Sequence, residues 1–116
     1  EGIANGEIAG CLRHFGGAGT NIYVDDFEQT GIALGDVVHV KLTKGEKTLF
    51  EQNVLYHRSF GYVKEGEPIL YNGSTSPYIA LSLNKRSFAE KYLPDIFNPG
   101  ERFSDYKISI NKLKED

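Results

Sequence analysis

Residues 60–93, which read FGYVKEGEPILYNGSTSPYIALSLNKRSFAEKYL, decide how this chain is expected to fold. They contain two strand-like segments, 67–71 and 78–83, separated by the polar sequence NGSTSP. Asn-Gly tolerates the positive φ angles of a chain reversal, and Pro fixes φ and lacks an N–H, so these residues predict a turn or a wide hairpin loop. Three aliphatic residues of the second segment recur at a period of two and therefore share one face of a strand: Ile79, Leu81 and Leu83.

The hydrophobic period changes after residue 83. Ser87 and Glu90 have the spacing of a capping box, in which a hydroxyl and a carboxylate bind the unpaired N–H groups of a helix start. Four apolar residues then fall on one helical face, and Pro94 ends the helix: Phe88, Ala89, Tyr92 and Leu93. A strand, a polar loop, a strand and a helix start in succession bring backbone donors together, which suits a polar small molecule. A hairpin with a packing helix and no ligand is the alternative.

Most of the remaining secondary structure is predicted to be strands. Residues 37–42 alternate, with Val38, Val40 and Leu42 on one face, and residues 103–113 alternate in the same way. Asp25 and Asp26 are expected to open one turn of helix. Seven or so short strands with glycine-rich turns predict an all-β fold, a small antiparallel β-barrel or a sandwich, with one or two short helices.

The domain organisation is expected to be simple. Residues 1–6 lack periodicity and are interpreted as a linker, and residues 7–116 as one barrel domain. The chain has no Met and begins with Glu1, so we expect it to be part of a longer protein.

Composition excludes several classes of function. No apolar run approaches the roughly 18 residues that a membrane helix needs, so no membrane partner is expected. The net charge is −3, with Lys and Arg scattered among Asp and Glu, which argues against nucleic acid as a partner. The single cysteine, Cys11, cannot form an internal disulfide, so a cytoplasmic location is expected, and this thiol is interpreted as buried and inert.

We recognise no catalytic or metal-binding motif in the sequence. His14, His39 and His57 are far apart and lack ligand-spaced partners, so no metal is predicted. Most of the seven Tyr and seven Phe residues must form the core. The clearest exception is Phe60, which is flanked by Ser and Gly and is expected at a strand edge.

One segment resembles a known family. Residues 15–22, FGGAGTNI, resemble the FGNxxTNI signature that opens the C-terminal domain of the S-adenosylmethionine hydroxide adenosyltransferases, a family that also contains the S-adenosylmethionine-dependent fluorinase and chlorinase. Residues 8–14 look like the strand before that signature, and residues 60–84 match the halogenase members without gaps.

The resemblance implies a two-domain enzyme that converts S-adenosylmethionine and water to adenosine and methionine. An N-terminal α/β domain, not contained in this chain, would carry the residues that position the nucleophile. The C-terminal barrel would bind adenine and methionine, with the active site between subunits of a homotrimer. S-adenosylmethionine is then the substrate, and no cofactor is expected.

The resemblance also assigns roles to individual residues. Phe60 matches the aromatic residue that packs on adenine, and Lys85 matches the residue whose backbone hydrogen-bonds the adenine edge. Thr75 and Ser76 match the pair that holds the amino and carboxylate groups of methionine, and Ser76 replaces a halogenase Arg, which favours the hydrolase branch. Gly17 stands where the family usually has an Asn that reaches the adenine. The resulting prediction is the nucleoside-binding domain of an S-adenosylmethionine hydrolase, inactive alone. The alternative is a stand-alone, non-catalytic β-barrel that binds a ligand or a protein.

Overall fold

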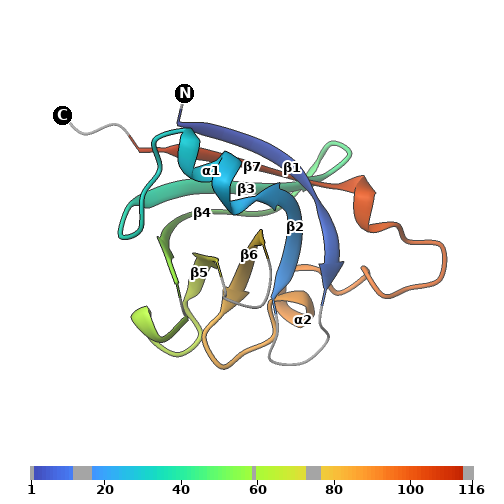
Figure 1. Cartoon of the computed structure of the whole chain (residues 1–116). Coiled ribbons are helices and arrows are strands. Elements are labelled where there is room, and N and C mark those ends of the chain that lie inside the picture. The colour runs from blue at the N-terminus through green and yellow to red at the C-terminus, as the bar shows by residue number, and fades with distance from the viewer. Residues whose placement is uncertain (1, 12–16, 59, 73–76, 114–116) are drawn as a thin grey trace.

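In the part of the chain that the structure describes, seven strands form a closed β-barrel around one hydrophobic core (Figure 1). The computed structural model describes residues 2–11, 17–58, 60–72 and 77–113, except the side chains of Cys11 and Phe60. The strands are β1 (Ile3–Cys11), β2 (Ala18–Tyr23), β3 (Val37–Lys44), β4 (Lys47–His57), β5 (Pro68–Tyr71), β6 (Tyr78–Leu83) and β7 (Tyr106–Lys112). The helices are α1 (Val24–Gln29) and α2 (Phe88–Tyr92), and the single 3₁₀ turns are η1 (Phe60–Tyr62) and η2 (Phe103–Asp105). The predicted small all-β barrel with one or two short helices is confirmed.

The strand order around the barrel is β1-β2-β6-β5-β4-β3-β7, and β7 closes it against β1. Every neighbouring pair is antiparallel except β4 with β5, which run parallel over three residues, with His57 opposite Tyr71. Parallel neighbours require the chain to return to the end from which it started. Residues 60–67 belong to this returning connection, and they include η1. The sequence did not predict this parallel pair.

Two local predictions are wrong. β1 begins at Ile3, inside the range 1–6 that was interpreted as a linker, and Ile3–Gly6 pair with Asn111–Ile108 of β7. This pairing closes the barrel and satisfies backbone groups, so it orders a segment that has no hydrophobic pattern of its own. Phe60 is in a 3₁₀ turn after β4 rather than at a strand edge.

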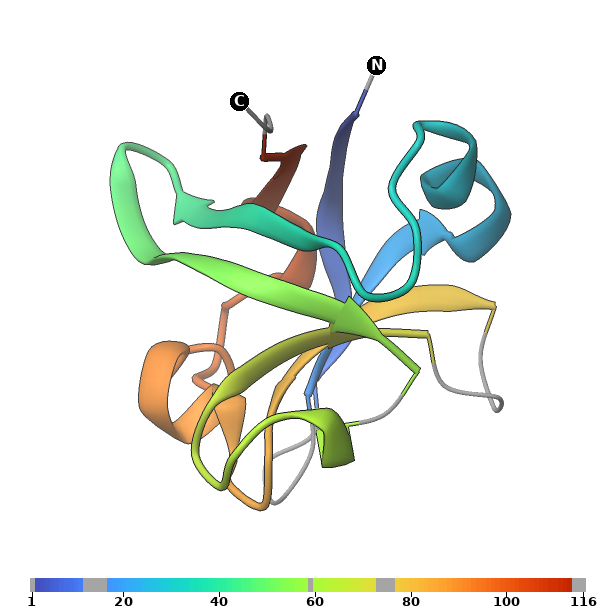
Figure 2. The same cartoon turned by 90° about the vertical axis from the view of Figure 1, so that its left-hand side faces the viewer.

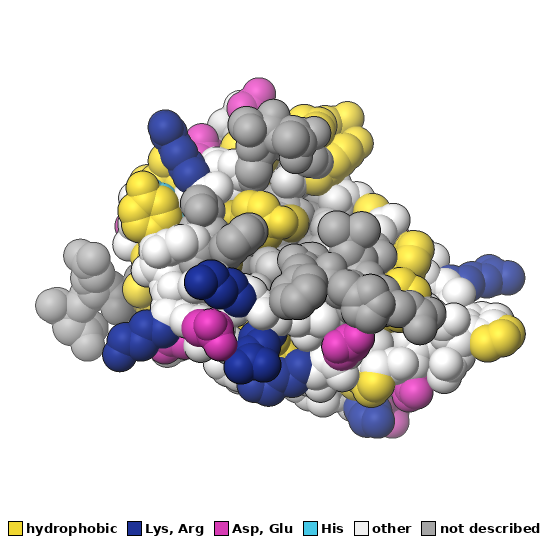
Figure 3. Space-filling view, turned by 90° about the horizontal axis from the view of Figure 1, so that it is seen from below, with side chains coloured by type: hydrophobic (Ala, Val, Ile, Leu, Met, Phe, Trp, Pro, Cys, Tyr) yellow, Lys and Arg dark blue, Asp and Glu magenta, His cyan; other side chains and the backbone are white. Residues whose placement is uncertain are grey.

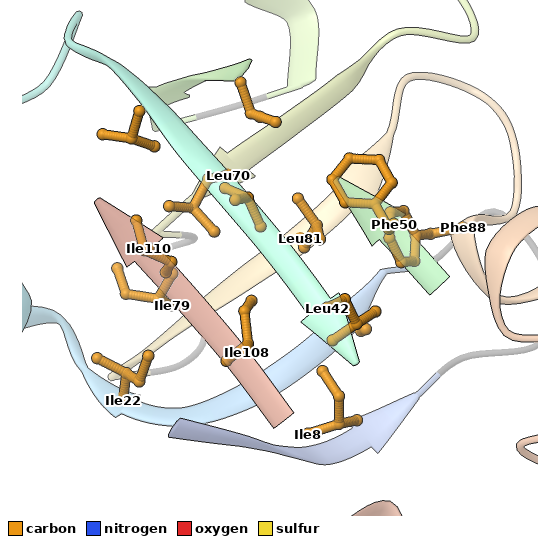
Figure 4. Close-up of a cluster of buried hydrophobic side chains, with 14 of the residues drawn as sticks. Ile8, Ile22, Leu42, Phe50, Leu70, Ile79, Leu81, Phe88, Ile108 and Ile110 are labelled. Atoms are coloured by element: carbon orange, nitrogen blue, oxygen red, sulfur yellow. The ribbon is translucent and has the colours of Figure 1, made fainter. Parts of the chain in front are cut away.

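Strand alternation predicted the core correctly. Val38, Val40 and Leu42 have no exposed surface, and Ile79, Leu81 and Leu83 are also buried. Figure 4 shows side chains from several strands, among them Leu42, Ile108, Leu70 and Leu81, pointing into the same interior. Removing this apolar surface from water is the main driving force for folding. The packed core in turn holds the strands, and therefore their ends, in place.

The two short helices differ at their starts, because a side chain caps α2 and none caps α1. Ser87 caps α2, because its Oγ accepts a hydrogen bond from the backbone N–H of Glu90 at 3.2 Å, as predicted. Phe88 of α2 packs edge-on against Phe50 of β4, with ring centroids 5.2 Å apart. The turn of helix predicted at Asp25 and Asp26 is α1, which begins one residue earlier, at Val24. The residue at its N-cap position, Tyr23, makes no side-chain capping hydrogen bond. Among the described residues, no helix combines the length and hydrophobicity that crossing a membrane requires.

Candidate functional site

Three segments lie at one end of the barrel, the lower end in Figure 1: the start of β2, η1 and the turn between β6 and α2. Three of the five predicted site residues belong to or adjoin these segments. Gly17 immediately precedes β2, Phe60 begins η1, and Lys85 lies in the turn between β6 and α2. Figure 2, turned by 90°, shows the same three segments at this end. Figure 3 shows that Lys and Arg side chains lie beside Asp and Glu side chains on this face. Thr75 and Ser76 lie outside the described residues.

Gly17 is pressed against β6. Its neighbour Ala18 is paired with Leu81, and a Cβ added at Gly17 would lie 2.3 Å from the Leu81 carbonyl oxygen and 2.9 Å from the Cβ of Ser82. Real Cβ atoms do not approach other atoms so closely. A side chain at this position therefore requires β2 to move away from β6, so Gly17 acts here through its backbone.

Lys85 has an unusual backbone conformation. Its φ of 59° is left-handed, and among the residues that the structure describes it is the only non-glycine residue with positive φ. This conformation costs free energy in residues with a Cβ, and such strain concentrates at functional sites. The Lys85 side chain is exposed, so packing of that side chain does not account for the conformation.

The turn that contains Lys85 is braced by the preceding residue. Asn84 is buried, and its Nδ2 donates to the carbonyl of Val63 at 2.8 Å. Its backbone N–H donates to the backbone carbonyl of Glu67 at 3.0 Å, and its own carbonyl accepts from the backbone N–H of Gly66 at 2.8 Å. Three hydrogen bonds therefore fasten the Lys85 turn to the connection that also contains η1.

His57 links η1 to the end of β5. Its ring stacks on Tyr62 of η1, with centroids 3.6 Å apart and planes 18° from parallel. Its Nδ1 accepts from the backbone N–H of Arg58 at 3.0 Å, and its carbonyl accepts from the backbone N–H of Asn72 at 3.3 Å. Asn72 directly precedes residues 73–76, the segment that contains the predicted methionine-binding pair. His57 therefore joins the connection that carries Phe60 to the residue before that segment.

Hydrogen bonds to Tyr56 and to helix α1 hold the residues on both sides of 73–76 in place. On one flank, Asn72 Nδ2 donates to the Tyr56 hydroxyl at 2.7 Å, and that hydroxyl donates to Glu28 Oε2 at 2.9 Å. On the other flank, the N–H of Val24 donates to the Pro77 carbonyl at 2.8 Å. Burial and the neighbouring Glu28 carboxylate raise the pKa of the Tyr56 phenol far above its usual range, so it remains a neutral donor.

Sequence reasoning missed Asn84, Tyr56 and the structural role of His57. Their roles depend on contacts with partners from other segments, which no local motif reports. His57 was considered only as a metal ligand. Within the described ranges, no three His, Cys, Asp or Glu side chains lie close enough to hold a metal ion. His14 and the thiol of Cys11 lie outside the described residues.

This end and the described flanks of residues 73–76 together offer aromatic rings, braced backbone turns and neutral hydrogen-bonding groups. These groups suit the recognition of a planar polar molecule. A family model described as the SAM hydroxide adenosyltransferase C-terminal domain matches residues 12–95, which include this end and both flanks of residues 73–76. The chain belongs to this family.

The resemblance predicted from the sequence is confirmed by this match. The barrel of this hydroxide adenosyltransferase domain is also similar to the crystal structure of an uncharacterized conserved protein from Thermotoga maritima. The TM-score is 0.73 at 23% sequence identity, and the similarity covers 97% of this chain and 37% of that chain. This likeness shows a shared fold, and the domain corresponds to only 37% of the longer Thermotoga chain.

Proposed function

We propose that this domain binds the nucleoside part of S-adenosylmethionine in an enzyme that hydrolyses it to adenosine and methionine. The observation that carries the proposal is the placement of Gly17, η1 and the left-handed Lys85 at one end of the barrel. These positions were chosen from the sequence for adenine recognition, and membership of the hydroxide adenosyltransferase family supports the same ligand.

Each residue has a distinct task in this proposal. The ring of Phe60 stacks on adenine, and such stacking contributes about 1–3 kcal/mol per base. The backbone of Lys85 hydrogen-bonds the adenine edge, where its left-handed φ of 59° sets the direction of the peptide groups. Thr75 and Ser76 bind the amino and carboxylate groups of methionine. The backbone of Gly17 borders the adenine site, because no side chain fits between it and Leu81.

The reaction requires little from this domain beyond recognition. The oxygen of water forms a bond to the ribose C5′ as the bond between C5′ and sulfur breaks. The bonding pair stays on sulfur, which leaves as the neutral thioether of methionine, and the water gives up one proton. The sulfonium is already a good leaving group, so positioning and desolvating the nucleophile are the main catalytic tasks. We assign those tasks to an N-terminal α/β domain and to a trimer with the active site between subunits.

Calorimetry of adenosine binding to the complete protein tests the proposal. Phe60→Ala is expected to raise the Kd for adenosine about tenfold or more, from the magnitude of base stacking. Phe103→Ala is a matched control, because Phe103 also begins a 3₁₀ turn, η2, on another flank of the barrel, and it should leave the Kd unchanged. Equal Kd values for wild type and Phe60→Ala would remove Phe60 from the site.

A second measurement separates the enzyme from a stand-alone binding module. This chain alone is expected to release no adenosine from S-adenosylmethionine, as followed by chromatography, because the nucleophile-positioning groups are assigned to the other domain. Sustained turnover by this chain would refute that assignment. Failure of the complete protein to bind adenosine would favour the stand-alone module.

A further inference from the structure

We propose that His57 is a positioning residue for nucleoside binding, which holds η1, and with it Phe60, in the orientation that the ligand needs. The inference rests on the proposed function. It concerns a residue that does not touch the reacting atoms and that acts through its neighbours on both sides.

His57 contacts two segments of the candidate site, η1 and the end of β5. Its ring lies flat against Tyr62, the last residue of the 3₁₀ turn that Phe60 begins. Its carbonyl accepts a hydrogen bond from Asn72, and it lies opposite Tyr71 in the parallel β4–β5 pair. The barrel therefore holds the backbone of His57, while its side chain extends to η1.

Turn η1 needs such a support. A single 3₁₀ turn of three residues has poor hydrogen-bond geometry and little stability of its own. Tyr62 is 58% exposed, so the core contributes little to holding it. Within the described residues, the ring of Tyr62 in η1 stacks on the ring of His57. His57 is the last residue of β4, and its side chain is half-buried.

Histidine is well suited to this position because one side chain makes both interactions. The flat ring stacks on Tyr62, and Nδ1 accepts the hydrogen bond from the Arg58 N–H, which fixes the ring orientation. This hydrogen bond assigns the ring proton of the neutral imidazole to Nε2. Phenylalanine can stack but cannot accept, and alanine can do neither.

A pre-oriented ring binds a base more tightly, because the entropy of ordering has been lost before the ligand arrives. Loss of the His57 ring should therefore weaken adenosine binding without removing any ligand contact. The same loss should speed amide hydrogen exchange in residues 60–62, because their turn would open more often.

The experiment measures the adenosine Kd and the hydrogen exchange of residues 60–62 in the complete protein. His57→Ala is expected to raise the Kd about tenfold and to accelerate that exchange, whereas His57→Phe, which keeps the stack, should recover part of both effects. Tyr62→Ala should behave like His57→Ala, and Tyr62→Phe, which keeps the ring, should behave like wild type. His39→Ala is the matched control, since His39 contacts Asn53 and Glu51 on the neighbouring strand β4 and its loss should change neither quantity.

The outcomes distinguish this inference from the proposed function. If wild type binds adenosine and both His57→Ala and Tyr62→Ala bind it equally well, the positioning role is refuted and the proposed function stands. If wild type does not bind adenosine, the proposed function is refuted and this inference with it. Should His57→Ala fail to fold, Tyr62→Ala decides the question, because Tyr62 is an exposed residue whose truncation spares the core.

Discussion

Replacement of Gly17 by alanine provides a sharp test of the barrel geometry. The added Cβ would lie 2.3 Å from the carbonyl oxygen of Leu81, whereas carbon and oxygen normally approach to about 3.3 Å. The two strands must therefore separate by about 1 Å at a point where Ala18 and Leu81 have no exposed surface.

The expected magnitude follows from two opposing effects. Overpacking of a rigid interior costs about 1–3 kcal/mol, and the upper end applies because the obstructing atom belongs to the backbone of a buried strand. The lower chain entropy of unfolded alanine returns about 0.4–1 kcal/mol. The net loss of unfolding free energy is about 2 kcal/mol, which lowers the Tm of a domain of this size by about 8 °C.

The assay is thermal unfolding of this chain followed by circular dichroism, with Gly10→Ala as the matched control. Gly10 lies in β1, pairs with Gly19 of β2, and has nothing within 4 Å of an added Cβ. Gly10→Ala should therefore leave the Tm unchanged or raise it slightly. Equal Tm values for the two variants would show that β2 and β6 separate freely at Gly17, which would refute the argument that no side chain fits there.

Three further predictions concern single residues. Lys85→Gly should relieve the left-handed strain and raise the free energy of unfolding by about 0.5–1 kcal/mol, as measured by denaturant unfolding. It should leave the adenosine Kd of the complete protein unchanged. Weaker binding would mean that the Lys85 side chain contacts the ligand. Ser87→Ala should cost about 1 kcal/mol, because it removes the cap of α2, and an unchanged unfolding midpoint would contradict this role. Hydrogen bonds that the His39 ring donates to Asn53 Oδ1 and Glu51 Oε2 raise the pKa of His39 above 6.5. The charged form therefore favours the folded state below pH 6.5, and this contribution disappears as the pH rises through the raised pKa. NMR titration should show that Glu51→Gln brings the His39 pKa closer to 6.5, and an unshifted value would exclude this partner.

The candidate site shows where local patterns stop being informative. Gly17 and Lys85 could be singled out from family motifs, but the close approach of Gly17 to β6 and the left-handed φ of Lys85 could not. A motif records residue types in order, whereas a φ angle or a strand separation depends on partners from elsewhere in the chain. His57 illustrates the same limit, because its partner Asn72 becomes a neighbour only through the parallel pairing of β4 and β5.

The sequence by itself determined the all-β class, the buried faces of β3, β6 and β7, and the capped start of α2, because strand alternation and helix capping depend on residues that are close along the chain. Only the tertiary structure decided that residues 3–6 close the barrel, that β4 and β5 run parallel, and that one end gathers Gly17, η1 and Lys85. These features arise from backbone hydrogen bonds and close packing between distant segments. The free energy of such contacts depends on the whole closed sheet, so no local stretch of sequence specifies them.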